Sequence, residues 1–189
     1  MKTVLRRKYR EKRSELSASD REKMTDLLLI NFQKIELPFI SCVHTYLASA
    51  DHLEIDTYIF TRYLQFINPD LRIVVPKVDH EKGSMKHFIF NEQTELSVNS
   101  FGILEPSTGE EVSVKEIELV ITPLLVFDER GYRVGYGKGY YDKFFATCHP
   151  ETIKIGLSYF DPIPSIIDVN KFDIPLNYCI TPDKLYSFK

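Results

Sequence analysis

At 189 residues, with 43% hydrophobic and 27% charged residues, the chain is long enough to bury a substantial core and fits one domain, residues 1–189, better than two. Its net charge of −3 excludes a general attraction to nucleic acid or anionic membrane, so any anion-binding site must be local. Three widely spaced cysteines without a Cys-x-x-Cys pair argue against a disulfide framework or a zinc knuckle.

The N-terminus and the hydropathy pattern indicate a soluble cytoplasmic protein. Charged residues begin at Lys2 without an apolar signal region, and no run approaches the ~18 apolar residues that a membrane-spanning helix needs. We therefore expect neither secretion nor a membrane partner.

Two helices are predicted at the start of the chain. Residues 2–16 form a basic helix in which four cations recur at three- or four-residue spacing and share one face: Lys2, Arg6, Arg10 and Arg13. A capping box from Ser19 to Glu22 then predicts a second helix that ends before Pro38. Its inward residues are Met24, Leu27, Leu28 and Ile35.

Strand and helix patterns alternate over the next segment. Residues 39–48 are predicted as the first strand, followed by a helix over 53–67 and strands over 71–78 and 84–90. The helix has as inward residues Ile55, Ile59, Tyr63 and either Phe66 or Ile67. Residues 91–116 are polar and irregular, and their pattern predicts no element.

The second half of the chain contains the most apolar segment. Residues 117–128 are almost wholly apolar, which is typical of a central strand covered on both faces. Asp128 to Gly131 has the signature of a type I turn. A short helix over 139–148, a buried strand over 152–159 and a last strand over 178–181 follow. This alternation predicts a three-layer α/β/α fold with a mainly parallel sheet.

The stretch RVGYGKGYYD, residues 133–142, carries three of the chain's eight glycines at alternate positions around a lysine. Gly135, Gly137 and Gly139 have no Cβ, so successive backbone N–H groups there can form a concave nest for an anion. Lys138 adds a positive charge, and a helix beginning near Tyr140 would point its positive end at the same place.

Counting excludes two familiar nucleotide motifs. The Walker A pattern fails because Tyr132 stands five residues before Gly137 and glycine follows Lys138. The Rossmann pattern G-x-G-x-x-G fails because the third glycine, Gly139, comes one residue early. A glycine-rich turn that only joins a strand to a helix is the alternative on pattern alone.

The longer stretch PLLVFDERGYRVGYGKGYYDKF, residues 123–144, closely resembles the signature of the 5-formyltetrahydrofolate cyclo-ligase family, also called 5,10-methenyltetrahydrofolate synthetase. The resemblance extends to Lys2 with Arg6, to the segment Glu54-Ile55-Asp56-Thr57 and to Asp173. Leu124 departs from the glycine of many relatives. The spacing before Glu54 is also slightly longer than in some of them.

This resemblance implies a Rossmann-like sheet of the NagB/RpiA/CoA-transferase-like kind. It also implies ATP-dependent cyclisation of 5-formyltetrahydrofolate to 5,10-methenyltetrahydrofolate, with Mg²⁺ as cofactor and release of ADP and phosphate. The expected partners are a reduced folate and ATP, with no nucleic acid, and a monomeric state is expected.

The resemblance also carries roles to individual residues. The catalytic residues are Lys138 and Arg133. The ATP-binding residues are Lys2, Arg6, Arg133, Val134, Gly135, Tyr136, Gly137, Lys138, Gly139, Tyr140 and Tyr141. The substrate-binding residues are Glu54, Tyr136, Gly137, Lys138, Gly139 and Tyr140. Asp142 and Asp173 would supply oxygen ligands to Mg²⁺.

Other readings of these residues stay open. Lys2 could be a frayed terminus, Glu54 an acidic residue near a helix start, and Asp173 a turn residue. Two other functions fit a similar pattern: a sugar-phosphate isomerase or CoA-transferase on the same fold, and a nucleotide- or RNA-binding module that uses the basic helix. The five histidines show no metal-binding spacing, so a histidine metal site has little support.

Overall fold

A seven-stranded sheet forms the centre of the computed structural model, which describes residues 1–99 and 102–188. The strand order is β11-β10-β9-β6-β1-β2-β3. These strands are β1 (Cys42–His44), β2 (Arg72–Asp79), β3 (Ser84–Ile89), β6 (Leu119–Thr122), β9 (Ile153–Leu157), β10 (Tyr178–Ile180) and β11 (Leu185–Ser187). The five strands from β10 to β2 are parallel, and β3 and β11 are antiparallel edges.

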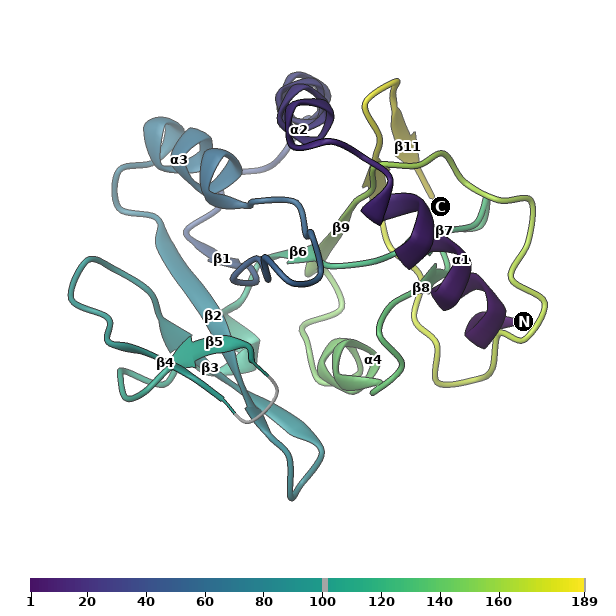
Figure 1. The fold of residues 1–189 in the computed structure, drawn as a ribbon. Coiled ribbons are helices and arrows are strands. Elements are labelled where there is room, and N and C mark those ends of the chain that lie inside the picture. The colour runs from purple at the N-terminus through teal and green to yellow at the C-terminus, as the bar shows by residue number, and fades with distance from the viewer. Residues whose placement is uncertain (100–101, 189) are drawn as a thin grey trace.

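Helices cover both faces of this sheet (Figure 1). The helices are α1 (Lys2–Ser14), α2 (Ala18–Phe32), α3 (Tyr58–Ile67) and α4 (Tyr140–Phe145), with one 3₁₀ turn at Val114–Glu116. Helices α2 and α3 lie on one face and α4 lies on the other, which confirms the predicted α/β fold with a mainly parallel sheet. Likeness to a wider superfamily stays a prediction.

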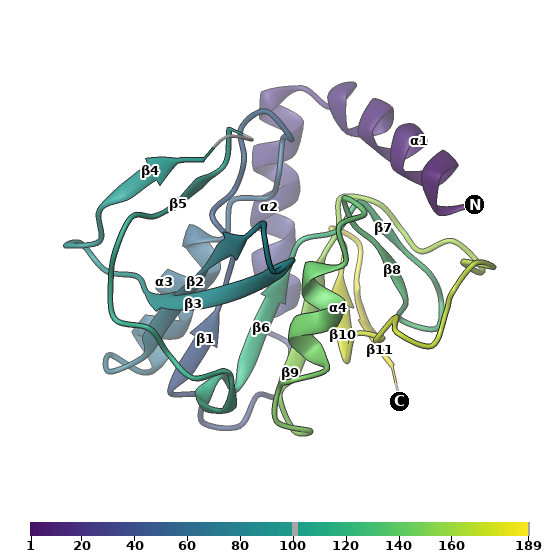
Figure 2. The same cartoon turned by 90° about the horizontal axis from the view of Figure 1, so that it is seen from below.

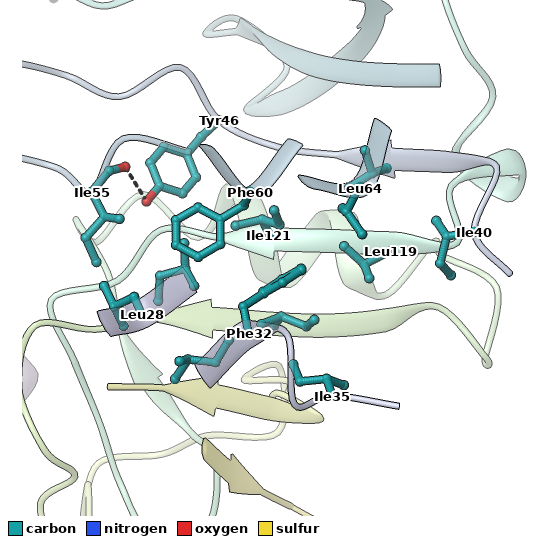
Figure 3. Close-up of a cluster of buried hydrophobic side chains, with 14 of the residues drawn as sticks. Leu28, Phe32, Ile35, Ile40, Tyr46, Ile55, Phe60, Leu64, Leu119 and Ile121 are labelled. Carbon is teal, nitrogen blue, oxygen red and sulfur yellow. Dashed lines mark hydrogen bonds between the residues drawn. The ribbon is translucent and has the colours of Figure 1, made fainter. Parts of the chain in front are cut away.

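The alternation of side chains along the strands explains the two faces. Val43 and Leu119 pack into the cluster beneath α2 and α3, whereas Cys42 and Val120 pack toward α4. Figure 3 shows the first cluster, in which the rings of Phe32 and Phe60 meet edge to face at 5.4 Å. Complete burial of side chains such as these stabilises the fold by roughly 1.5–3 kcal/mol each.

Several helix predictions need correction. The capping box joins Ser17 to Asp20 rather than Ser19 to Glu22, because Ser17 Oγ accepts from Asp20 N while the Asp20 carboxylate accepts from Ser17 N. Helix α2 therefore begins at Ala18 and places Ser19 inside its first turn. It ends at Phe32, and Leu27, which was predicted inward, is 45% exposed.

Helix α3 is also shorter than predicted. It begins at Tyr58, and Phe60, Thr61 and Leu64 are its buried residues. Ile55 is buried but precedes the helix, whereas Phe66 and Ile67 are 87% and 57% exposed. The prediction of inward residues is confirmed for Ile59 and Tyr63, which are partly buried and pack against this core, and was wrong for the last turn of the helix.

The apolar segment 117–128 is not one strand. Strand β6 ends at Thr122, and Pro123, which has no N–H to donate, follows it. The chain then forms a separate hairpin of β7 (Val126–Phe127) with β8 (Arg133–Val134). The turn at its tip is confirmed by the Gly131 N to Asp128 O hydrogen bond of 2.9 Å. The glycine stretch therefore follows this hairpin rather than a central strand.

Two other regions contain strands that the sequence did not predict. The region 91–116 contains a hairpin of β4 (Leu96–Val98) with β5 (Leu104–Pro106). Strand β10 is not the last strand, because β11 pairs antiparallel with it.

Cys42, Cys148 and Cys179 are free and buried thiols. Among the described residues, no helix has the length and apolar character needed to cross a membrane.

Two buried histidines beneath α4 make the stability depend on pH. The rings of His44 and His87 lie 5.1 Å apart and contact Phe144. Burial lowers the pKa of His87 to about 4 and that of His44 well below its ordinary value. The unfolded chain binds protons below its ordinary histidine pKa of ~6.5 and the folded chain does not, so stability decreases as the pH falls from ~6.5 toward 4.

We expect the free energy of unfolding to fall by about 2 kcal/mol for His87 alone between pH 7 and pH 5. Urea denaturation at the two pH values measures this loss. His87→Phe should remove much of the difference, whereas His149→Phe, at an exposed position, should not. A pH dependence that His87→Phe leaves unchanged would contradict the assignment.

Candidate active site

Two loops leave neighbouring strand ends at one edge of the sheet. Strand β1 continues after His44 into the loop that carries Glu54, and β6 continues after Thr122 toward the glycine stretch. The strands β1 and β6 are adjacent and parallel, and β1 has β2 on its other side, so the strand order changes direction here. The carboxyl edge at such a point is where open α/β sheets bind ligands.

The glycine stretch forms the loop between β8 and α4. Gly137 and Gly139 have φ of 95° and 72°, a backbone conformation that other residues rarely adopt. Gly139 is the N-cap residue of α4, which begins at Tyr140 as predicted. Lys138 lies between these two glycines and is exposed. The backbone of the loop therefore has the turns that a nest of N–H groups requires.

Helix α1 directs its basic face at this loop. The helix packs against β7 and β8, and Figure 2 shows it above the hairpin. Arg6 Nε donates to Gly135 O at 3.0 Å, and the Arg10 guanidinium lies 5.5 Å from the ring centre of Tyr136. Lys2 Nζ lies 2.6 Å from Asp173 Oδ2. The prediction that these cations share one face is confirmed, and Lys2 is not a frayed terminus.

Arg133 is less accessible than its predicted catalytic role suggested. Its side chain is only 6% exposed, and its guanidinium donates to Asp142 Oδ1 at 2.9 Å and to Ile174 O at 2.7 Å. The ring of Phe145 lies beneath it, 4.7 Å from Cζ. Burial lowers the pKa of Arg133, and the Asp142 charge opposes that shift. Arg133 thus joins the hairpin to α4, while Val134 beside it is buried in the core.

The two predicted metal ligands lie close together. Asp142 Oδ1 accepts from the backbone N–H of Ile174, the neighbour of Asp173, at 3.2 Å. Each carboxylate also pairs with a cation, Asp142 with Arg133 and Asp173 with Lys2. No group of three or more His, Cys, Asp or Glu side chains among the described residues could hold a metal by itself. Two hard carboxylates suit Mg²⁺, which completes its coordination with waters and phosphate oxygens.

Glu54 lies near the glycine stretch, although the two are far apart in sequence. Its Oε2 accepts from Ser49 N at 2.9 Å, which holds the loop 49–54 closed. Burial, followed by the negative charge of Glu54, raises the pKa of Tyr136 and of Tyr141. The ring of His52, in the same loop as Glu54, stacks on Tyr136, so the structure brings the loop of the predicted folate-binding residue beside the predicted nucleotide loop.

The two tyrosines that open α4 have different surroundings. Tyr140 is partly exposed, and its hydroxyl lies 3.2 Å from His80 Nδ1 at the tip of the β2–β3 hairpin. The Tyr141 hydroxyl is buried, with no hydrogen-bond partner among the described residues, and its ring packs against Phe144 and Phe145. Tyr141 is thus mainly a core residue, and Tyr140 contacts the β2–β3 hairpin through His80.

Residues that carried no predicted role also line the site. A cavity of about 310 Å³ lies between α1 and the loop 49–54. Its lining residues are Arg10, Glu11, Arg13, Ser14, Asp51, His52, Leu53 and Tyr136. The His52 ring stacks on Tyr136 at 4.9 Å, and Arg13 Nη1 donates to the Tyr136 hydroxyl at 3.1 Å. The basic periodicity of α1 pointed to Arg13, whereas nothing in the pattern pointed to His52.

A mainly parallel α/β sheet with a lysine-bearing glycine loop near its switch point is typical of enzymes that act on phosphate-containing ligands. Comparison with known families identifies which member of this class the chain represents. The 5-formyltetrahydrofolate cyclo-ligase family model matches residues 1–182. The chain belongs to this family.

Curated relatives carry the same description. The 5-formyltetrahydrofolate cyclo-ligase of Escherichia coli K12 is 30% identical over 109 residues, which cover 56% of this chain and 60% of that protein. The mitochondrial enzyme of Arabidopsis thaliana is 30% identical over 173 residues, which cover 78% of this chain and 62% of that protein. The chain thus spans about three-fifths of the length of these two relatives.

Solved structures support the fold over nearly the whole chain. The NMR structure of Aquifex aeolicus 5,10-methenyltetrahydrofolate synthetase matches with a TM-score of 0.79 and 25% identity, covering 100% of this chain and 93% of that one. The synthetase from Mycoplasma pneumoniae matches with a TM-score of 0.74 and 22% identity, covering 96% and 98%.

Proposed function

We propose that this protein catalyses the ATP-dependent cyclisation of 5-formyltetrahydrofolate to 5,10-methenyltetrahydrofolate. The observation that carries this proposal is the contact between the Glu54 loop, which follows β1, and the glycine loop, which follows the hairpin beyond β6: the His52 ring stacks on Tyr136 at 4.9 Å. Family membership supplies the substrates, and this geometry supplies a place where a nucleotide and a folate can meet.

The reaction needs ATP because the formamide oxygen is a poor leaving group. Transfer of the γ-phosphoryl group to the formyl oxygen converts that oxygen into part of a phosphate. The N10 amine then attacks the formyl carbon and loses its proton, the new C–N bond closes the ring, and the C–O bond breaks so that phosphate leaves with the oxygen. Catalysis of this kind depends mainly on positioning and charge stabilisation.

The residues of the glycine loop would bind the phosphates. Backbone N–H groups of 135–139 would cradle them, and Lys138 would offset the charge that builds on the transferred group. Arg6 donates a hydrogen bond to Gly135 O, and its guanidinium lies next to Gly137. Lys2 lies on the same side of the site, paired with Asp173. Arg133 would act through Asp142, because its guanidinium is buried against that carboxylate.

Asp142 and Asp173 would hold Mg²⁺ beside the phosphates, and the metal would supply positive charge to the transferred group. The cations that now pair with these carboxylates are Arg133 and Lys2, two of the predicted phosphate-binding residues. Lys2 would be available to phosphate oxygens if Asp173 took a Mg²⁺ ion, whereas the buried Arg133 would keep Asp142 in place.

The folate would approach from the side of Glu54. Its carboxylate can accept hydrogen bonds from the N–H edge of the pterin, and the rings of Tyr136 and Tyr140 suit contact with a flat heterocycle. The basic face of α1 is directed at this site rather than outward, which disfavours a role for it in RNA binding.

The proposal is tested by mixing the purified protein with Mg-ATP and 5-formyltetrahydrofolate and following the absorbance of the methenyl product. Product should form only when ATP is present. Turnover of sugar phosphates or CoA esters without nucleotide would instead favour an isomerase or a transferase on the same fold.

Two glycines provide a matched test of the phosphate nest. A Cβ at Gly135 would meet no atom within 4 Å, whereas at Gly137, with φ of 95°, it would lie 3.0 Å from Arg6 Cζ. Gly137→Ala should therefore lower the stability by about 1–3 kcal/mol. Gly135→Ala should leave the melting temperature unchanged and weaken ATP binding, because its methyl group occupies the space open to the phosphates.

Thermal unfolding and calorimetric titration with Mg-ATP measure these two effects separately. Equal ATP affinity for Gly135→Ala and the wild type would place the phosphates away from this loop.

A further inference from the structure

Arg13 is a buried cation that has no carboxylate partner in the part of the chain that the structure describes. It lies in the last turn of α1 and is 3% exposed. None of the ion pairs among the described residues includes Arg13, and its Nε has no hydrogen-bond partner there. Burying a guanidinium costs free energy unless hydrogen bonds offset the loss of hydration. The acceptors of Arg13 therefore indicate what its side chain holds in place.

The three acceptors of Arg13 come from three different segments. Nη2 donates to Leu124 O at 2.6 Å, in the segment that leaves β6. Nη1 donates to His52 O at 3.2 Å and to the Tyr136 hydroxyl at 3.1 Å. His52 belongs to the loop that carries Glu54, and Tyr136 belongs to the glycine loop. One planar guanidinium thus joins α1 to both loops and to the end of the central strand.

Arg6, two turns earlier on α1, has a different contact. Its Nε binds the backbone carbonyl of Gly135 and its guanidinium borders Gly137, so it supports the glycine-loop backbone where the phosphates would lie. Arg13 instead holds the Tyr136 side chain, which stacks on His52 at the wall of the 310 Å³ cavity. The two arginines therefore support different parts of the site.

We infer that Arg13 is a positioning residue for the folate part of the site, whereas Arg6 positions the nucleotide part. Arg13 fixes the Tyr136 ring and the Glu54 loop in the arrangement that receives the folate. This inference rests on the proposed function, because it assigns one of the two substrates to each arginine.

The test measures the dissociation constants of the full chain for 5-formyltetrahydrofolate alone and for Mg-ATP alone by calorimetry. Arg13→Gln should weaken folate binding about 10- to 100-fold, the effect of losing hydrogen bonds from a charged donor, and change ATP binding less than about threefold. Arg13→Lys, which keeps the charge but not the planar donor group, should give an intermediate loss. Arg7→Gln, at an exposed position on the same helix, should change neither constant.

A double-mutant cycle shows whether Arg13 acts through Tyr136. In the background of Tyr136→Phe, which lacks the hydroxyl that Arg13 binds, Arg13→Gln should have a clearly smaller effect on folate affinity than in the wild type. Purely additive effects would contradict action through Tyr136. If Arg13→Gln does not fold, Tyr136→Phe alone still tests the inference, because it should weaken folate more than ATP.

The possible failures are distinguishable. A wild-type protein that does not bind 5-formyltetrahydrofolate would refute the proposed function itself. A wild-type protein that binds it, with Arg13→Gln binding equally well or losing both ligands to the same extent, would refute only the division between the two arginines. Melting temperatures identify a variant whose loss of binding comes from unfolding.

Discussion

Replacing Lys138 with alanine should lower kcat by about two to three orders of magnitude, the scale on which removal of one preorganised charge-stabilising contact acts. Lys138 is exposed and stands between two glycines with positive φ, so its ammonium group can reach a ligand seated on the loop. The free energy of unfolding should change by less than about 0.5 kcal/mol, as for most surface substitutions. Steady-state kinetics and urea denaturation measure the two quantities.

Lys143→Ala is the matched control for this experiment. Lys143 is an exposed lysine on α4 whose Nζ donates to Gly83 O at 2.8 Å, at the end of the β2–β3 turn. Its loss should leave kcat within about twofold of the wild type, because its ammonium group already contacts the hairpin rather than the glycine loop. Similar kcat values for Lys138→Ala and the wild type would show that Lys138 does not stabilise the transferred phosphoryl group.

Replacing Asp142 with alanine should affect both stability and metal dependence. Asp142 accepts from Arg133 and from the Ile174 backbone, and Arg133 is 6% exposed. Removing the carboxylate leaves a buried cation without its partner, which should cost about 3 kcal/mol. Turnover should fall by orders of magnitude as well, because a predicted Mg²⁺ ligand is lost. Urea denaturation and Mg²⁺ titration of ATP binding test the two parts.

Asp142→Asn separates these two effects. An asparagine keeps an oxygen that can accept from Arg133 and Ile174, so much of the stability should return, whereas the weaker metal ligand should still raise the Mg²⁺ concentration required. Asp168→Asn is the control, because Asp168 pairs with the N-terminus and is 41% exposed. Unchanged Mg²⁺ dependence in Asp142→Asn would remove Asp142 from the metal site.

Short-range patterns predicted part of the geometry of the candidate site, while the roles of its residues came from the family resemblance and stay predictions. The spacing of Lys2, Arg6, Arg10 and Arg13 placed them on one face because an α-helix returns to the same side every three or four residues. Three of them contact the glycine loop and Lys2 contacts Asp173 beside it. The turns at the glycines, the start of α4 and the mainly parallel sheet were also predicted. The first two depend on residues that are neighbours in sequence, and the third was predicted from the alternation of strands and helices along the chain.

Hydrophobicity alone gave wrong predictions for the end of a strand and for apolar side chains that are exposed on helices. Residues 117–128 are apolar throughout, but Pro123 cannot donate to a sheet, so the chain leaves it after Thr122. Phe66 and Leu27 are apolar but exposed. Their residue type shows that they could be buried, but it does not show which side of the helix meets the sheet.

The sequence by itself thus determined the main helices, the central strands, the basic face and the glycine loop, because local backbone geometry and residue type decide these features. Only the tertiary structure decided the partners: Arg133 with Asp142, Lys2 with Asp173, and Arg13 between the Glu54 loop and Tyr136. The contact of Lys2 with Asp173 joins residues 171 positions apart, and the contacts of Arg13 form because the neighbouring strands β1 and β6 bring the segments that follow them together. No local pattern records that adjacency.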